Sequence, residues 1–333
     1  RSFWIIVIGT LLLFLYKFKK LKAEYMVGAI AILCLIDMWQ VNKRYLNDEM
    51  FVEKSVREQA QPMTQTDRQI LQDKSLDYRV LNLASNTFNE NETSYYHKSI
   101  GGYHAAKLRR YQELIDAYIS PEMQKMMPAI AKAGGDMTKV DGDSLFPVLN
   151  MLNAKYFIVP LQANQTVAIE NPYVYGNAWF VDKVTYVKNA NEELDALGKL
   201  NLRHEAVADA RFQSQLGESK NQDSTSIVKL TAYEPNQLTY DVRSATGGIV
   251  VFSEIFYPEW TATVDGKPVE IGRVDYVLRA LNVDKGHHKV VLTFDPKSVK
   301  QTETVAYLSY GVLLLVVLFA VYFKRKEDKK AQA

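Results

Sequence analysis

The chain has 333 residues, with 40 lysine and arginine residues against 38 aspartate and glutamate residues. The net charge of +2 produces no overall basic field, which argues against a nucleic-acid-binding protein. The one cysteine, Cys34, excludes an intramolecular disulfide, and the length allows two or three domains of ordinary size.

Apolar segments at the two ends of the chain predict three membrane helices. They are Phe3–Tyr16, Tyr25–Trp39 and Val305–Phe323, and the last has about 19 residues, close to the roughly 20 that cross a bilayer core. A buried helix of a soluble protein is the alternative for the two shorter runs. The sequence begins in an apolar run without a methionine or a signal-peptide cleavage pattern, so we expect the C-terminal part of a longer protein.

Two basic clusters predict the orientation of these helices. Four lysines lie between Lys17 and Lys22, and five basic residues lie between Lys324 and Lys330. Because positively charged loops stay in the cytoplasm, the first helix enters it, the second leaves it and the third returns. We therefore expect a multi-pass protein of the bacterial inner membrane, with residues 40–303 outside the cytoplasm.

The first part of the outer region predicts a mixed α/β domain. Strands are expected at 78–83, at 152–160 and at 178–187, the last broken at Asp182-Lys183. Gly101-Gly102 are expected to open a helix from Tyr103 to Ile119. Ser120-Pro121 then start a second helix, which Pro128 should break or kink, and a short helix covers 191–200.

The second part of the outer region predicts an antiparallel β-sandwich. Seven short alternating runs are typical of such a fold; they are 227–233, 237–243, 248–256, 260–264, 267–271, 277–283 and 288–294. Asp265-Gly266 between two of them is a strong signal for a two-residue hairpin.

These elements predict a membrane protein of α plus β class with six parts. They are a membrane hairpin at 1–39, a polar linker with surface helices at 40–77, an α/β domain at 78–212, a β-sandwich at 225–297, a membrane helix at 303–324 and a cytoplasmic basic tail at 325–333.

One cationic segment is the leading candidate for a binding site. The expected helix start would offer backbone N–H groups and a positive dipole end to the phosphate of a ligand or to a glycan. The candidate residues are His97, Lys98, Gly101, Gly102, Tyr103, His104, Lys107 and Arg110. A capped surface helix with solvated charges remains the alternative. Since no carboxylate or cysteine stands at ligand spacing from the histidines, no metal site is predicted.

Four ordered segments give the chain a resemblance to a known family. They read KSIGGYH at 98–104, NMLNAKY at 150–156, NAWFV at 177–181 and YPEW at 257–260 with DGK at 265–267. Together they closely resemble the YfhO family of bacterial membrane proteins, and their residues are similar to those of its Bacteroidetes branch.

The resemblance implies the last third of a glycosyltransferase of type C, which takes a sugar from a polyprenyl-phosphate carrier on the outer membrane face. Its catalytic carboxylate is expected upstream of this sequence, so no catalytic residue is assigned. The expected partners are the bilayer and a lipid-linked sugar or envelope glycan, without nucleic acid or a further cofactor. The alternative is a non-catalytic, membrane-anchored module for carbohydrate binding or envelope assembly. A transporter is disfavoured because none of the three helices carries an ionisable residue at mid-membrane.

Overall fold

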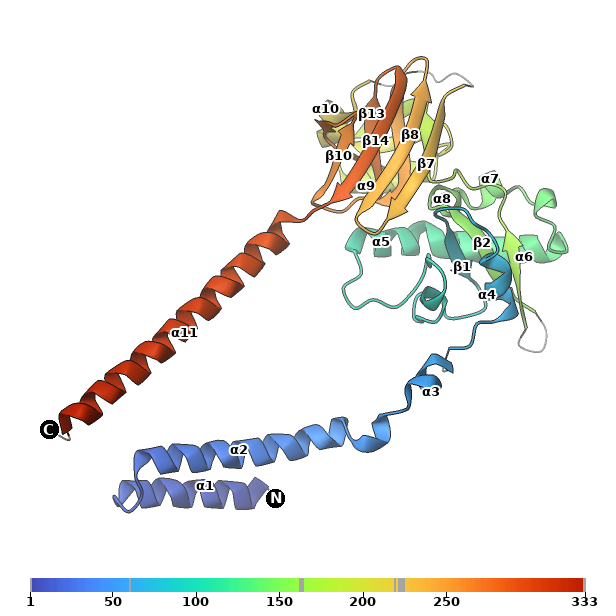
Figure 1. Ribbon diagram of the computed structural model, residues 1–333. Coiled ribbons are helices and arrows are strands. Elements are labelled where there is room, and N and C mark those ends of the chain that lie inside the picture. The colour runs from blue at the N-terminus through green and yellow to red at the C-terminus, as the bar shows by residue number, and fades with distance from the viewer. Residues whose placement is uncertain (1, 60, 162–164, 219, 221–224, 332–333) are drawn as a thin grey trace. The chain divides into compact units, whose positions relative to one another are not determined.

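The computed structural model describes residues 2–59, 61–161, 165–218, 220 and 225–331 (Figure 1). It divides into two compact units, Arg1–Pro62 and Met63–Ala333. Each unit is described by itself.

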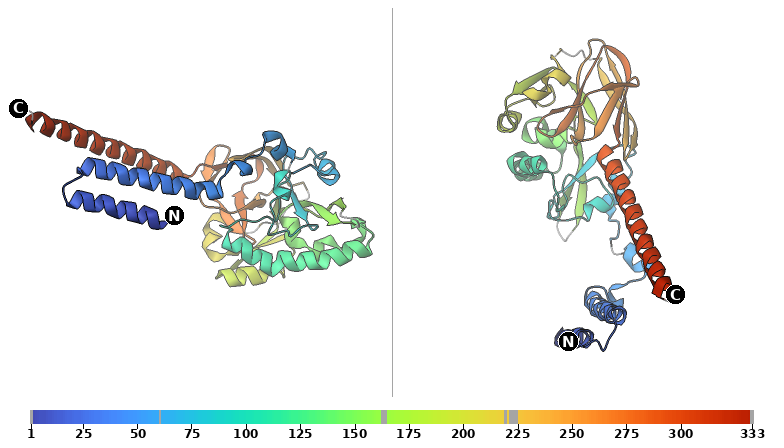
Figure 2. Two further views of the ribbon diagram at one scale, coloured as in Figure 1. Left: turned by 90° about the horizontal axis from the view of Figure 1, so that it is seen from below. Right: turned by 90° about the vertical axis from the view of Figure 1, so that its left-hand side faces the viewer.

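The first unit is helical. It contains α1 (Ser2–Lys17), α2 (Ala23–Tyr45), a 3-10 turn η1 (Asp48–Met50) and α3 (Lys54–Gln59). Helices α1 and α2 lie side by side and antiparallel, as Figure 2 shows. Length and composition allow the span Ala23–Met50 to cross a membrane, whereas the apolar helix Phe3–Lys17 is shorter than a full span.

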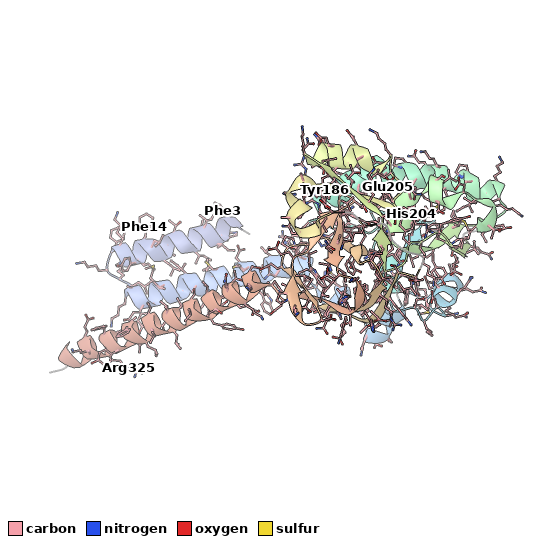
Figure 3. All side chains as sticks on the ribbon, turned by 90° about the horizontal axis from the view of Figure 1, so that it is seen from above. Phe3, Phe14, Tyr186, His204, Glu205 and Arg325 are labelled. Carbon is pink, nitrogen blue, oxygen red and sulfur yellow. The ribbon has the colours of Figure 1, made fainter. Side chains whose placement is uncertain are left out.

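A second helix of membrane-spanning length ends the chain. Helix α11 (Lys297–Ala331) contains the apolar span Lys297–Glu327, none of which is buried. The apolar side chains of α1 are exposed as well: Phe3 and Phe14, labelled in Figure 3, are 67% and 51% exposed. The prediction of membrane helices is therefore supported by α2 and α11.

The second unit contains short helices and turns and, in its first part, a three-stranded sheet. The helices and turns are α4 (Gln65–Ile70), η2 (Thr93–Tyr95), α5 (Arg109–Leu114), a π turn η3 (Ile115–Ile119), α6 (Ser120–Lys132), η4 (Met137–Lys139), α7 (Gly142–Leu145), α8 (Pro147–Met151), α9 (Ala190–Leu197), η6 (Ala210–Phe212) and α10 (Gln213–Leu216). The sheet has the order β1 (Arg79–Asn82), β2 (Ala154–Pro160), β3 (Thr166–Glu170). Strands β1 and β2 are parallel, and β3 is antiparallel to β2.

The helix after the glycine pair differs from the prediction. It begins at Arg109 rather than Tyr103, and it continues through the π turn into α6. A Cβ on Gly101 would lie 2.0 Å from the carbonyl oxygen of Thr87, while the N–H of Gly102 donates to that oxygen at 2.7 Å. The glycines therefore allow a close approach of two loops and do not open a helix.

The two prolines do not divide this helix as predicted. Ser120 N–H donates to the carbonyl oxygen of Ile115, a π-type bond that widens the turn just before Pro121. Pro121 has no N–H to pair where this register change occurs, and Pro128 lies inside α6. One helical run thus extends from Arg109 to Lys132.

The rest of the second unit is mostly β. The remaining strands are β4 (Ala178–Val181), β5 (Lys183–Val187), β6 (Glu205–Asp209), β7 (Ile227–Glu234), β8 (Gln237–Ser244), β9 (Gly248–Ile255), β10 (Trp260–Val264), β11 (Lys267–Val269), β12 (Gly272–Val274), β13 (Leu278–Val283) and β14 (Gly286–Phe294). They form one sheet of order β11-β10-β14-β8-β7, one of order β12-β13-β9-β4 and the pair β5-β6. The first two sheets are antiparallel throughout (Figure 1).

The predicted hairpin is confirmed. Asp265 and Gly266 have φ of 51° and 79°, and they join β10 to β11 with Val264 opposite Lys267. Two central residues with positive φ are the signature of the turn that matches strand twist in a two-residue hairpin.

The two outer parts predicted as separate domains share a strand and a core. Strand β4 pairs with β9, with Ala178 opposite Phe252. One hydrophobic cluster extends from Leu81 to Ala280, and a second contains buried side chains of both larger sheets. The turn-like segment expected to separate these parts, 213–224, includes residues 219 and 221–224, which lie outside the described residues.

Part of the predicted linker also packs on the second unit. The hydroxyl of Thr66 on α4 donates to the carbonyl oxygen of Thr166 on β3 at 2.9 Å, and Ile70 is fully buried. The second unit accordingly starts near Met63.

Candidate functional site

Three of the four sequence motifs meet around Asp77. Lys98 forms an ion pair with the Asp77 carboxylate and lies 3.1 Å from the ring centroid of Tyr233. The amides of Asn153 and Asn177 both donate to the carbonyl oxygen of Asp77, at 3.3 and 2.9 Å. These motifs therefore hold the region of β1 in place, which is a structural role.

The fourth motif forms one wall of a cleft of 330 Å³, here named the arginine cleft. Its other walls are the start of α5 and the hairpin between β12 and β13. The lining residues are Leu108, Arg109, Arg110, Tyr111, Ile255, Phe256, Tyr257, Pro258, Arg273, Tyr276 and Val277. An adjoining hollow of 250 Å³ shares Leu108, Tyr111 and Ile255 and is also lined by Arg79 and Gly101.

A larger hollow of 730 Å³ lies between the end of α6 and strands β2 and β3. Its lining is mostly apolar and includes none of the predicted site residues. Convergent charge, which fixes the orientation of a ligand, is found instead at the arginine cleft.

Two arginines of the arginine cleft share one buried carboxylate. Glu193 on α9 is fully buried, and one of its oxygens lies 3.2 Å from Arg110 and 3.0 Å from Arg273. Arg273 is 5% exposed, and its Nε has no hydrogen-bond partner among the described residues. Burial lowers the pKa of the Arg273 guanidinium, against the attraction of Glu193, which raises it.

Arg110 and Arg109 are positioned by further contacts. The Arg110 guanidinium lies 4.4 Å from the ring centroid of Tyr276 and donates to the Tyr276 carbonyl oxygen at 3.4 Å. Arg109 donates to Glu113 at 2.9 Å. The Tyr276 hydroxyl donates to Glu113 as well, and this bond is the main cause of the lowered pKa of the Glu113 carboxyl.

The hairpin beside these arginines has an unusual backbone. Asp275 and Tyr276 have φ of 48° and 71°, a region that costs energy for residues other than glycine and is often found at functional sites. Asp275 is held by two bonds to Val207, since its N–H donates to the Val207 carbonyl and its carboxyl accepts from the Val207 N–H at 3.0 Å. Burial raises the pKa of Asp275 to about 8.

These contacts leave one positive charge in excess at the arginine cleft. Among the described residues, Arg109 forms an ion pair with Glu113, whereas Arg110 and Arg273 both form their ion pairs with Glu193. Asp275 is mostly protonated at neutral pH and does not offset the difference. The arrangement suits an anionic ligand, since guanidinium groups bind phosphate and carboxylate through paired donors.

The arginine cleft lies next to the start of α11. The ring centroids of Tyr257 and Phe294 are 6.1 Å apart, and Phe294 ends the strand that precedes this helix. Glu259 accepts a hydrogen bond from the backbone N–H of Ser298 in the first turn of α11 at 3.0 Å.

The structure brings only some of the predicted site residues to this place. Arg110 lines the arginine cleft and Gly101 lines the adjoining hollow. His97 is buried and bonded to Asp67 at 2.9 Å, and Lys98 is bound to Asp77.

The remaining candidates lie in the loop before α5. Tyr103 is 66% exposed, His104 accepts a bond from the Ala106 N–H, and Lys107 lies 5.5 Å from the ring centroid of Phe88. Gly102 has φ of 103°, which favours glycine.

Sequence reasoning missed the residues that complete the arginine cleft. The tertiary fold brings to Arg110 three residues that lie far from it in the chain. They are Glu193, Arg273 and Tyr276, each 80 or more residues away. Arg273 stands in a strand of three residues, too short to show alternation. Among the described residues, no group of three or more His, Cys, Asp and Glu side chains is arranged to hold a metal ion.

Two buried carboxyl groups predict an unusual pH dependence of stability. Burial raises the pKa of Asp275 from 3.8 to about 8 and that of Glu122 from 4.5 to about 8, although Glu122 accepts bonds from Val148 N–H and Leu149 N–H. A folded-state pKa above the unfolded value means that the folded state binds more protons between these values. Each group should therefore make its full contribution to the free energy of unfolding below about pH 4. That contribution should fall by about 1 kcal/mol per pH unit as the pH rises toward 8.

Denaturant unfolding followed by near-ultraviolet circular dichroism, repeated across this pH range, measures the slope. Asp275→Asn and Glu122→Gln should each flatten it. Equal slopes in the wild type and both variants would show that these groups are ionised in the folded protein.

Comparison with known proteins identifies a family for part of the chain. Residues 198–306 match the family described as bacterial membrane protein YfhO. The matched segment contains the arginine-cleft residues from Ile255 to Val277. No curated protein and no solved structure matches the chain significantly.

Proposed function

The chain belongs, through its residues 198–306, to the YfhO family of bacterial membrane proteins, and we propose that it is the extracytoplasmic ligand-binding part of a membrane glycosyltransferase. The intact enzyme would take a sugar from a polyprenyl-phosphate carrier and attach it to a cell-envelope glycan. In this proposal the arginine cleft binds the phosphate-bearing ligand, and the catalytic residues belong to another part of the enzyme.

The excess positive charge beside the start of α11 carries this proposal. A lipid-linked phosphate reaches a protein at the membrane surface, and α11 has the length and composition of a membrane span. The arginine cleft combines three guanidinium groups with aliphatic and aromatic walls. This combination fits a ligand with a charged phosphate and apolar or ring-shaped neighbours.

One observation favours the alternative, a non-catalytic module for carbohydrate binding or envelope assembly. No aspartate or glutamate is among the described residues that line the arginine cleft. The nearby carboxylates are engaged, Glu193 by two arginines and Glu113 by Arg109 and Tyr276. A carboxyl group that acts as general acid or base must be within hydrogen-bond reach of the substrate.

Arg109→Ala tests the role of the arginine cleft. The Arg109 side chain is 91% exposed, so losing its ion pair with Glu113 should cost less than about 1 kcal/mol of stability. If Arg109 contacts the ligand phosphate, its removal should weaken binding by roughly 1.5–3 kcal/mol, which is about one to two decades in affinity. Binding of a polyprenyl-phosphate-linked sugar to the protein in detergent, measured beside the melting temperature, gives both quantities.

Arg243→Ala is the matched control, because Arg243 is also exposed and paired, with Asp241 at 3.1 Å on β8. Equal binding by both variants and the wild type would show that Arg109 does not contact the ligand and would contradict this part of the proposal. Binding that depends on Arg109 without any sugar transfer by the full-length enzyme would favour the non-catalytic module.

We further propose that α1, α2 and α11 cross the inner membrane with residues 40–303 outside, and that the two larger antiparallel sheets face each other as a β-sandwich. The basic clusters at 17–22 and 324–330 support the orientation. The hydrophobic cluster that contains side chains from both sheets supports the sandwich.

Single cysteines in a Cys34→Ala background test the orientation. We expect a membrane-impermeant thiol reagent to label Lys285→Cys in intact cells and to label Lys326→Cys only after lysis. Both positions are exposed in the structure, so access by the reagent reports the side of the membrane. The reverse pattern would overturn the topology.

A further inference from the structure

The loop before α5 carries two large side chains that are exposed to solvent. Tyr103 is 66% exposed and Leu108 is 41% exposed. The segment from Ser94 to Tyr111 contains four lysine and arginine residues and no acidic residue. Exposed apolar groups that lie together within a polar rim mark surfaces that contact a partner.

Leu108 places this loop at one end of the β-structure. Leu108 and Tyr257 line the same cleft, and Tyr257 is itself 47% exposed. Tyr257 contacts Phe294, and α11 begins three residues later at Lys297. Leu108 and Tyr257 are therefore beside the point where the chain leaves the sheet toward α11, and Tyr103 precedes Leu108 by five residues in the same loop.

The opposite end of the same sheet differs in composition. Strand β10 runs from Trp260, opposite Phe294, to Val264, opposite Val290. The hairpin beyond Val264 carries Asp265, Gly266 and Lys267, all exposed and polar. The exposed side chains of Tyr257 and Leu108 thus belong to the end of the sheet from which α11 emerges.

We propose that Tyr103, Leu108 and Tyr257 form a membrane-contacting surface that rests in the headgroup layer of the bilayer beside α11. Tyrosine rings prefer this layer because one end is apolar and the other is polar. The positive charge of Lys107 on the same loop would be attracted by anionic headgroups.

The bilayer is the partner because the chain itself enters it at this end, through a helix whose apolar residues are exposed along its length. Contact at the loop would fix the tilt of the domain and bring the opening of the arginine cleft to the membrane surface. The proposal rests on α11 spanning the membrane and is independent of glycosyl transfer.

Depth-dependent quenching in the full chain tests the contact. Single-cysteine variants Tyr103→Cys, Leu108→Cys and Lys267→Cys in the Cys34→Ala background are labelled with an environment-sensitive fluorophore. The proteins are reconstituted in phosphatidylethanolamine–phosphatidylglycerol vesicles that contain lipids with a nitroxide near the headgroup. We expect several-fold stronger quenching at 103 and 108 than at 267, and weaker quenching when phosphatidylglycerol is replaced by phosphatidylcholine.

Quenching at 103 and 108 no stronger than at 267 would overturn the proposal. Emission that shifts with the protein-to-lipid ratio, without quenching by the nitroxide, would identify a second copy as the partner and would overturn it as well. A label at position 108 would also lie against the arginine cleft, whose apolar lining could itself shift the fluorophore emission to the blue. A blue shift without quenching therefore does not count as support. Amide hydrogen exchange of the unlabelled wild type gives a second measurement, since residues 101–108 should exchange more slowly in these vesicles than in detergent.

Discussion

Glu193→Ala should lower the free energy of unfolding by about 3–5 kcal/mol, because it leaves buried guanidinium charge without its carboxylate. Glu193 is fully buried, and it is the shared partner of Arg110 and Arg273. Arg273 is itself only 5% exposed, so most of its side chain is shielded from water. Denaturant titration of the protein in detergent measures the loss.

Two further variants show whether charge is the cause. Asp195→Ala changes an exposed carboxylate on the same helix and should cost little. The double variant Glu193→Leu with Arg273→Met replaces a buried pair by apolar side chains and should recover much of the loss. A loss as large in the double variant as in Glu193→Ala would mean that helix packing, rather than the unpaired arginine, is responsible.

Gly101→Ala should destabilise the protein by about 3 kcal/mol through overpacking. The new Cβ would lie 2.0 Å from the Thr87 carbonyl oxygen and 2.8 Å from its carbonyl carbon. Both are backbone atoms, so no side-chain rotation relieves the clash, and the loop before α5 must move. Thermal unfolding and the rate of limited proteolysis within residues 86–108 measure the change.

Gly134→Ala is the matched control for this substitution. Gly134 has φ of 65°, and a Cβ there would meet nothing within 4 Å. Its cost should be the backbone strain alone, about 1–2 kcal/mol. If Gly101→Ala cost no more than Gly134→Ala, the close approach to Thr87 would not be a feature of the protein in solution.

Local chemistry made the β part of the chain predictable. Alternation along 227–294 gave seven strands within a few residues of their observed bounds, and Asp265-Gly266 forms the expected hairpin. Strand β12 was missed because its three residues are too few to show a period of two and, unlike the equally short β11, it does not follow a two-residue hairpin signal. Strand β4 was identified, but its partner β9 lies about 70 residues away, so the shared sheet could not be predicted.

The candidate site was predictable only in part, for the same reason. Arg110 was identified from a run of cations, yet its position depends on Glu193, 83 residues later. His97 belongs to the same run and is instead a buried partner of Asp67, 30 residues earlier. The glycine pair was interpreted as a helix start because the sequence does not show what lies beside it. In the structure the Thr87 backbone is so close to Gly101 that there is no room for a side chain.

The pairing of β4 with β9 has a consequence for synthesis of the protein. Val181 belongs to a hydrophobic cluster that also contains Val251 and Ala280, so the first half of the second unit cannot bury all of its apolar surface until β9 and β13 have been translated. Roughly 100 residues therefore leave the ribosome between β4 and the last strand it needs, about 5–20 s at ordinary elongation rates. During that interval the nascent chain should bind chaperones, and its release should coincide with the emergence of α11.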